Sequence, residues 1–162
     1  MVNFVLSSLS DTKNLAQSLA RLIIKTKPFP KILFQGALGT GKTTFIRFLV
    51  ETLPGSEQAE ISSPSFNLVN IYPTTPEVAH FDLYRLNTSG WDESLEELLF
   101  DQQKIVLVEW SEFLPPHLEL KHTLNIKIIL QEQKRNVEIR ATEKEKTIIS
   151  LLKTRGLHQK LI

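Results

Sequence analysis

The spacing of apolar residues along the chain predicts four helices. Apolar side chains that recur every three or four positions form one face of a helix. The first predicted helix follows the N-cap residues 8–12, and the second runs from residue 45 to Pro54–Gly55. The third covers Trp91 to Asp101. The fourth lies at the end of the chain, where Ile148, Leu151 and Leu152 are expected to face inward. We expect the first helix to pack beside a strand at 31–34.

Strands are predicted where apolar runs are short or alternate with polar residues. Two short, mostly apolar runs, typical of interior strands, occupy residues 31–34 and 105–108. Alternating runs at 66–72 and 78–85 flank a proline-rich turn, and those at 124–130 and 137–141 flank a turn at 131–135. Each pair indicates an antiparallel hairpin. Together these elements predict an α/β fold whose sheet mixes parallel and antiparallel strands and is flanked by helices.

Length and composition indicate a single domain over residues 1–162, with the ordinary hydrophobic content of a globular protein, 41%. No apolar run approaches the length of a membrane span, and no signal-peptide pattern opens the chain. We therefore expect a cytoplasmic protein that has no contact with a membrane. The chain contains no cysteine, which excludes disulfides and thiolate metal sites.

The net charge of +1 hides an asymmetry between the two parts of the chain. Residues 1–120 carry 9 basic and 14 acidic side chains, whereas residues 121–162 carry 10 basic and 4 acidic ones. A basic region can meet RNA or an acidic protein surface, or it can be a solvated face that keeps the protein soluble. Aromatic residues are not interleaved with these charges as in RNA-binding motifs.

The stretch from Gly36 to Thr44 fits Gly-x-x-x-x-Gly-Lys-[Ser/Thr], the loop that binds nucleotide phosphates. It lies between a predicted strand and a predicted helix, as that chemistry requires. Glycines let the backbone turn its N–H groups inward, and the helix presents the positive end of its dipole. Lys42 would reach the terminal phosphates and Thr43 the Mg²⁺ ion. The backbone of Leu38, Gly39, Thr40, Gly41, Lys42, Thr43 and Thr44 would form the cradle.

Two carboxylates are candidates for the metal and the chemistry. Glu109 ends the apolar strand that follows, the usual position of the second acidic contact for Mg²⁺. Asp82 lies on a predicted polar strand face with His80 and Tyr84, where it would orient water or approach the metal, or else pair with Arg85 at a strand edge. Trp110 is a wall of the site or plain core packing.

The Ser63-Pro64-Ser65-Phe66 turn is a further candidate, because its hydroxyls are of the kind that sense a terminal phosphate, although Ser-Pro turns also open many strands. Together with Gly36–Thr44, His80-Phe81-Asp82-Leu83-Tyr84-Arg85-Leu86 and Val108-Glu109-Trp110-Ser111-Glu112, this turn resembles the TsaE (YjeE) family. That family consists of small bacterial ATPases needed to make threonylcarbamoyladenosine in tRNA. The likeness runs from about Leu9 to Arg140.

The resemblance implies ATP and Mg²⁺ as cofactors and an α/β phosphate-loop fold with a mixed sheet. It assigns Lys42 and Thr43 to the phosphates and the metal, and Glu109 to the second metal contact. It makes Asp82 a catalytic or switch carboxylate with Trp110 as its neighbour. Asp11 and Arg135 match family positions near the nucleoside. The implied partner is a TsaB–TsaD heterodimer that ATP hydrolysis resets, with tRNA contacted indirectly through that complex.

The chain departs from the family pattern at two positions. Ala37 stands where an acidic residue is usual, which bears on partner contacts or turnover more than on phosphate binding. Ser65 stands where threonine is usual and keeps the hydroxyl.

Two other functions fit the same loop. One is a kinase for a small metabolite, although only Arg85 and Lys104 are basic between residues 54 and 112. The other is a nucleotide-dependent binding subunit with negligible hydrolysis, since the same carboxylates bind Mg²⁺ in either case. The sequence lacks the Asn-Lys-x-Asp motif for guanine. No arginine finger is evident in cis unless the late hairpin delivers Arg135, so slow hydrolysis without partners is expected.

Overall fold

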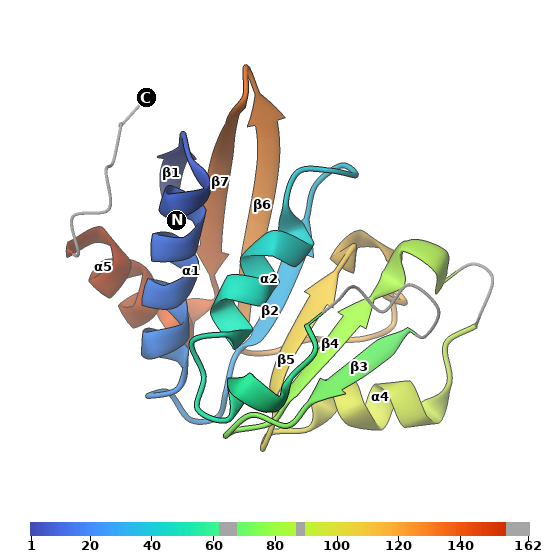
Figure 1. Cartoon of the computed structure of the whole chain (residues 1–162). Coiled ribbons are helices and arrows are strands. Elements are labelled where there is room, and N and C mark those ends of the chain that lie inside the picture. Colours follow the sequence, from blue (N-terminus) through green and yellow to red (C-terminus); the bar gives the residue numbers. More distant parts are fainter. Residues whose placement is uncertain (62–67, 87–89, 155–162) are drawn as a thin grey trace.

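The computed structural model describes residues 1–61, 68–86 and 90–154. Its seven-stranded sheet has the order β1-β7-β6-β2-β5-β4-β3 (Figure 1). The strands are β1 (Val2–Leu6), β2 (Lys31–Gln35), β3 (Val69–Tyr72), β4 (Val78–Asp82), β5 (Ile105–Glu109), β6 (Thr123–Gln131) and β7 (Lys134–Ala141). The Ser63–Phe66 turn, including Ser65, and Arg155 lie outside the described residues.

The sheet mixes the two strand directions, which confirms the predicted fold class. Strands β4, β5, β2 and β6 run parallel to one another, whereas β3 pairs antiparallel with β4 and β7 pairs antiparallel with β6 and β1. The two hairpins were both expected from the alternating runs. The second is tighter than predicted: only Glu132 and Gln133 form its turn, both with positive φ (46° and 65°). Arg135 therefore belongs to strand β7.

Four α-helices lie in the described residues: α1 (Leu9–Ile23), α2 (Lys42–Val50), α4 (Glu93–Phe100) and α5 (Lys146–Thr154). Helices α1, α2 and α5 share one apolar core with strands β1, β7, β6 and β2. Helix α4 covers the opposite face at β4 and β5, where Leu95 and Leu99 pack against Phe81. Helix α1 was expected to pack beside β2, but it packs mainly against α2.

Two local predictions are corrected by the structure. Strand β1 was not expected, although Val2, Phe4 and Leu6 alternate with more exposed residues in the manner of a half-buried strand. In α5 the buried residues are Ile148, Ile149 and Leu152, while Leu151 is 43% exposed. The helix is rotated from the predicted face because its apolar stripe is defined by tertiary packing against α1 and β7.

Candidate functional site

The glycine-rich loop joins β2 to α2 at the carboxyl ends of the parallel strands. Gly36 has a φ of 145°, and a Cβ there would lie 2.4 Å from the backbone oxygen of Ile128 in β6. Gly41 caps α2 with a φ of 101° in the left-handed region. Only glycine adopts both conformations without strain. These two glycines therefore let the loop turn tightly against β6 and open directly into the helix.

Lys42 is buried in the loop that it follows. Its Nζ donates hydrogen bonds to the carbonyl oxygens of Gly36 (2.7 Å) and Ala37 (3.2 Å) and lies 3.7 Å from the centroid of the Trp110 ring. The side chain thus folds over the cradle with its charge on the indole face, a favourable cation–π arrangement.

The charge environment of Lys42 combines two opposed effects. Burial lowers the pKa of Lys42, and the carboxylates of Glu109, Glu112 and Asp82 oppose that fall in the pKa. Burial disfavours the charged form, whereas nearby negative charges favour it. A bound phosphate would supply further negative charge and hold the ammonium protonated.

Thr43, in the first turn of α2, contacts Glu109 at the end of β5. The Thr43 hydroxyl donates to Glu109, with distances of 2.8 Å to Oε1 and 3.0 Å to Oε2. Glu109 is 2% exposed at the end of β5, where its register partners are Phe34 in β2 and Asp82 in β4. Parallel pairing of three strands thus brings the predicted metal contacts together.

Asp82 was expected in the interior of a strand, but it is the last residue of β4. It is half-buried, and its Oδ1 accepts the backbone N–H of Tyr84 at 3.1 Å, which begins the short 3₁₀ helix η2 (Leu83–Arg85). The predicted polar strand face is therefore interrupted: His80 is fully buried, whereas Tyr84 is 51% exposed on the turn. The register still places Asp82 beside Glu109.

Trp110 joins the loop to a small aromatic group. Its backbone has a positive φ of 56°, and its ring lies 4.8 Å from Tyr84 and 6.0 Å from Phe113, measured between centroids. A tryptophan in the left-handed region is uncommon, and such outliers cluster at functional sites. Trp110 thus packs against Tyr84 and Phe113 and lies beside the Lys42 ammonium.

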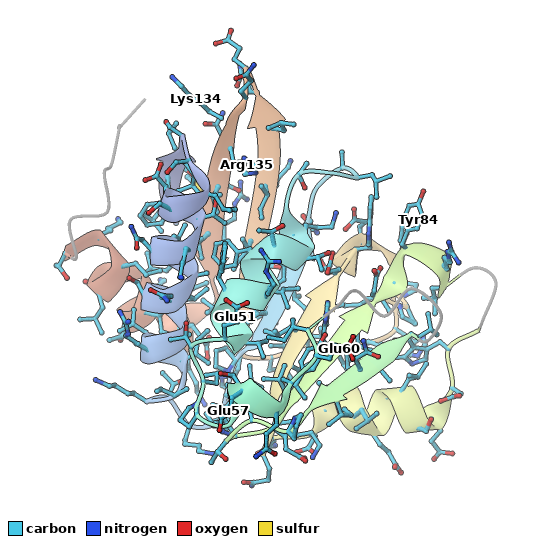
Figure 2. All side chains as sticks on the ribbon, in the orientation of Figure 1. Glu51, Glu57, Glu60, Tyr84, Lys134 and Arg135 are labelled. Carbon is cyan, nitrogen blue, oxygen red and sulfur yellow. The ribbon has the colours of Figure 1, made fainter. Side chains whose placement is uncertain are left out.

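Arg135 reaches the loop from the far hairpin. Its Nε donates to the carbonyl oxygen of Thr40 at 3.1 Å, and its guanidinium stem also lies beside Gly41. Figure 2 shows Arg135 on the hairpin at the same end of the molecule as Tyr84. The Arg135 side chain therefore brings a cation to the loop at Thr40 and Gly41.

Asp11 has a structural contact in the first helix. Its carboxylate accepts the backbone N–H groups of Ser7 and Ser8, and the Ser8 hydroxyl accepts the Asp11 N–H, forming a capping box for α1. Strand β1 ends at Leu6 opposite Arg135, so Asp11 lies at the same end of the sheet as the loop.

The remaining loop residues differ in exposure. Leu38 is 76% exposed at the tip, whereas Thr40 is buried and donates its hydroxyl to the Ala37 carbonyl at 2.9 Å. Gly39 has open space where a Cβ would stand, and Thr44 is half-buried in the first turn of α2. The tip is therefore accessible while its base is fixed by backbone contacts.

Sequence reasoning gave no role to His80 and did not single out Tyr72, and both adjoin the site. His80 Nε2 lies 3.0 Å from Glu109 Oε1, and its Nδ1 lies 3.0 Å from the hydroxyl of Tyr72. The available signal was a histidine two residues before Asp82 on an alternating strand. Its significance depends on the neighbouring strand, which sequence spacing does not show.

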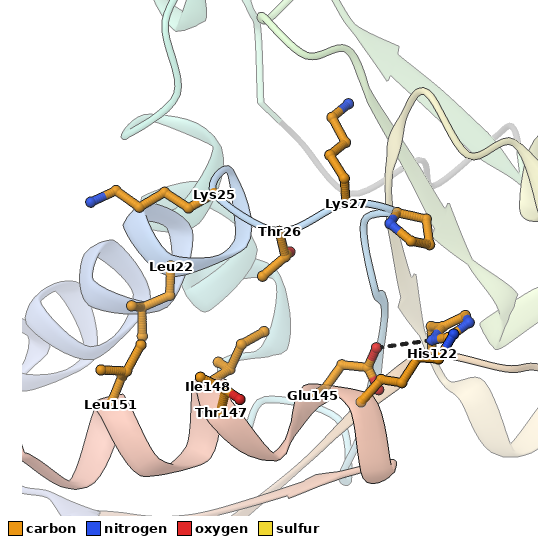
Figure 3. A pocket seen from close by; sticks show the side chains of 11 residues that line it. Leu22, Lys25, Thr26, Lys27, His122, Glu145, Thr147, Ile148 and Leu151 are labelled. Atoms are coloured by element: carbon orange, nitrogen blue, oxygen red, sulfur yellow. Dashed lines mark hydrogen bonds and ion pairs between the residues drawn. The ribbon is translucent and has the colours of Figure 1, made fainter.

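A cavity of about 370 Å³ lies at the opposite end of the sheet, far from the loop (Figure 3). It is bounded by the end of α1, the segment before β2, and the start of α5, and its walls include Leu22, Pro28 and Ile148. His122 and Glu145 pair in its wall, with Nδ1 and Oε1 3.1 Å apart. None of the predicted site residues borders this cavity, so it is separate from the phosphate loop.

Within residues 1–61, 68–86 and 90–154, no three or more His, Cys, Asp or Glu side chains are grouped so as to hold a metal ion by themselves. The same part of the chain has no helix both long and apolar enough to cross a membrane.

Known proteins share both the sequence and the fold. The family described as "Threonylcarbamoyl adenosine biosynthesis protein TsaE" matches residues 6–139. The tRNA threonylcarbamoyladenosine biosynthesis protein TsaE of Rickettsia felis is 34% identical over 158 residues, covering 94% of this chain and 88% of the relative. The protein of the same name from Aquifex aeolicus is 37% identical over 139 residues, covering 83% and 92%.

A solved structure supports the fold independently. The crystal structure of Bacillus subtilis YdiB superposes with a TM-score of 0.72 and 23% identity, and the match covers 94% of each chain. The family match over residues 6–139 includes the glycine-rich loop and both residues of the Thr43–Glu109 contact. This protein therefore belongs to the TsaE family.

Proposed function

We propose that this protein is a Mg²⁺-dependent ATPase required for threonylcarbamoyladenosine modification of tRNA. Family membership supports the pathway, because the relatives are named for the biosynthesis of that nucleoside. The observation that carries the ATPase activity is the direct contact of Thr43 with Glu109 beside the buried Lys42. This combination pairs a phosphate loop with the acidic end of a neighbouring strand.

The loop fits nucleotide phosphates on structural grounds. Gly36 and Gly41 keep Cβ atoms away from the cradle, and α2 begins directly at Lys42. The first N–H groups of a helix lack intrahelical partners and attract anions. We expect Lys42 to exchange its two carbonyl contacts for phosphate oxygens when ATP binds. The absence of a guanine-recognition motif favours ATP over GTP.

Thr43 and Glu109 are the residues that would hold the metal. Mg²⁺ usually takes one or two protein oxygens and completes its shell with phosphates and water. When bound, Mg²⁺ neutralises developing charge on the phosphate oxygens. The Thr43 hydroxyl is already aligned by Glu109, so a lone pair remains for the ion. Asp82, held by the Tyr84 N–H beside Glu109, is proposed to orient the attacking water.

Partner dependence follows from the shortage of cations placed over the cradle. Arg47 lies on the outer side of α2 with Glu51 at 3.7 Å, so it is not directed at the loop. We propose that a TsaB–TsaD heterodimer binds this protein and raises its ATP turnover. ATP hydrolysis then resets the complex, and the protein contacts tRNA only indirectly, through that complex. We propose that it acts in the cytoplasm. Arg135 is the alternative source of a stimulating cation, because it already contacts Thr40.

The test is phosphate release from labelled ATP, with the products identified. Wild type and Arg135→Ala are each assayed alone and with TsaB and TsaD. Slow turnover that rises only with the partners supports the proposal, since a supplied arginine is worth about 10³–10⁵ in rate. Fast turnover by the lone wild type that collapses in Arg135→Ala would show an internal finger and overturn partner dependence.

The alternative of a metabolite kinase is disfavoured by the position of Lys104. It bonds Glu77 at the amino end of β5, the end opposite Glu109. The acceptor pocket of a kinase would then have only Arg85 from residues 54–112 near the loop. The same assay distinguishes this function, because a kinase transfers phosphate to an acceptor and releases none. A binding subunit would retain ATP and release no phosphate with or without partners.

A further inference from the structure

A buried hydrogen-bonded series extends from the Thr43–Glu109 pair into the sheet. Glu109 Oε1 contacts His80 Nε2 at 3.0 Å, and His80 Nδ1 contacts the Tyr72 hydroxyl at 3.0 Å. His80 is 0% exposed, Glu109 2% and Tyr72 3%. The members come from α2, β5, β4 and β3, so the series crosses three neighbouring strands.

The chemistry of these groups determines the direction of each hydrogen bond. An ionised carboxylate only accepts, so His80 Nε2 must carry the hydrogen that faces Glu109. In the neutral ring Nδ1 is then an acceptor, and the Tyr72 hydroxyl donates to it. Thr43 donates to the same carboxylate from the other side. Each polar atom of the His80 ring is therefore satisfied in one tautomer, as burial requires.

His80 is enclosed too completely to act on a substrate. A fully buried ring behind Glu109 cannot contact a nucleotide or an attacking water. What it can do is fix the rotation of the Glu109 carboxylate, with one oxygen held by His80 and the group turned toward Thr43. A carboxylate with only Thr43 as a partner would rotate about its terminal torsion, which is a broad and soft one.

We propose that His80 and Tyr72 are positioning residues that aim Glu109 at the metal. The proposal rests on the function proposed above, in which Thr43 and Glu109 hold Mg²⁺. Residues that orient metal-binding groups typically change metal affinity by about 10–100-fold when removed. His80 and Tyr72 should therefore govern the coupling between Mg²⁺ and ATP, while the loop continues to hold the phosphates.

Three substitutions distinguish a role in orienting Glu109 from a role in filling space. His80→Gln keeps an N–H donor near the position of Nε2, whereas His80→Asn is shorter and keeps an acceptor for Tyr72 without the donor for Glu109. Tyr72→Phe keeps the ring volume and removes only the hydroxyl. Calorimetry measures ATP affinity in EDTA and at saturating Mg²⁺, and the ratio of the two affinities is the readout. Melting temperatures are recorded for each variant.

We expect affinity in EDTA to be unchanged in all three variants. The Mg²⁺-dependent gain should fall by about tenfold or more in His80→Asn, less in Tyr72→Phe, and recover toward wild type in His80→Gln. Nitrogen NMR of the nucleotide-free wild type should show hydrogen on Nε2 and none on Nδ1 of His80. Equal gains in His80→Asn and wild type, or the opposite tautomer, would overturn the proposal.

The outcomes distinguish the two proposals. If the wild type binds no ATP in either condition, the proposed function fails and the positioning role falls with it. If the wild type shows a Mg²⁺-dependent gain and the variants reproduce it, only the positioning role fails. Should His80→Asn not fold, Tyr72→Phe and the NMR measurement still decide the question.

Discussion

Two of the histidine–glutamate pairs in the described part of the chain lie at opposite ends of the sheet, and they differ in burial and in their neighbours. His80 and Glu109 have side chains 0% and 3% exposed and lie on adjacent parallel strands at the phosphate loop. His122 and Glu145 are 24% and 7% exposed and join the start of β6 to the turn before α5. Both pairs are within hydrogen-bond distance, 3.0 Å and 3.1 Å.

The neighbours of each pair explain the difference. Glu109 also accepts from Thr43 and lies near the Lys42 ammonium, so its carboxylate faces a cation and a helix terminus. Glu145 accepts from the Thr142 hydroxyl, which in turn accepts the Thr123 N–H. The first pair is connected through Thr43 to the start of α2 at the glycine-rich loop, and the second connects chain segments to each other. We infer that the same two residue types serve chemistry at one end and stability at the other.

The largest effect is expected for Lys42→Ala, which removes the cation from the functional end. Charge-assisted hydrogen bonds are worth about 1.5–3 kcal/mol each, so losing contacts to two phosphates should weaken ATP binding by at least about a hundredfold. Calorimetry measures the affinity. Arg47→Ala, on the outer side of the same helix, is the matched control and should leave it unchanged. Unaltered affinity in Lys42→Ala would refute the site.

Glu109→Gln and Glu145→Gln compare the two acids directly. Glu109→Gln removes the charge at the metal contact while keeping an acceptor for Thr43, so turnover should fall by about 10–100-fold, with a smaller Mg²⁺-dependent gain in ATP affinity and little loss of the affinity measured in EDTA. Glu145→Gln should leave turnover at the wild-type value. Phosphate release and ATP affinity are measured for both, after melting temperatures establish that each folds. Similar losses of turnover in the two variants would erase the proposed difference between the ends.

His122→Ala tests the structural role of the second pair. The variant loses a hydrogen bond to a partly buried carboxylate and places alanine at a φ of 58°. We expect a loss of about 1–2 kcal/mol in the free energy of unfolding, equivalent to a fall in Tm of about 2–8 °C. ATP affinity should not change. A variant with normal stability but altered nucleotide binding would contradict the assignment.

The smallest effect is expected for Lys104→Met, at an exposed ion pair with Glu77. The hydrogen bond from Lys104 raises the pKa of its own ammonium, so its stabilising contribution is present below the unfolded pKa of about 10.4 and is lost as pH rises through the higher folded value. Because both side chains are partly exposed, the contribution should be less than about 1 kcal/mol. Chemical denaturation at pH 7 and pH 11 measures it, and a larger difference between wild type and variant at pH 11 would contradict this sign.

Sequence patterns determined the local parts of the site. The glycines, Lys42 and Thr43 act within a contiguous strand, loop and helix, so their spacing alone predicts how the backbone turns. The apolar run before Glu109 likewise predicted a buried strand that ends in a carboxylate. The Arg47–Glu51 pair follows from helical spacing and is present at 3.7 Å. These features depend on neighbours within a few positions, where periodicity and turn chemistry are informative.

Only the tertiary structure decided which distant residues meet the loop. Thr43 and Glu109 are 66 positions apart, and Arg135 reaches Thr40 across 95 positions. These contacts depend on strand order and register, which place β5 beside β2 and bring Arg135 of β7 to the loop. The same register turns His80 from an apparent polar-face residue into the buried partner of Glu109. Side-chain alternation shows that a strand has two faces, but it does not show which strand lies next to it, because pairing between strands is decided by packing over the whole chain.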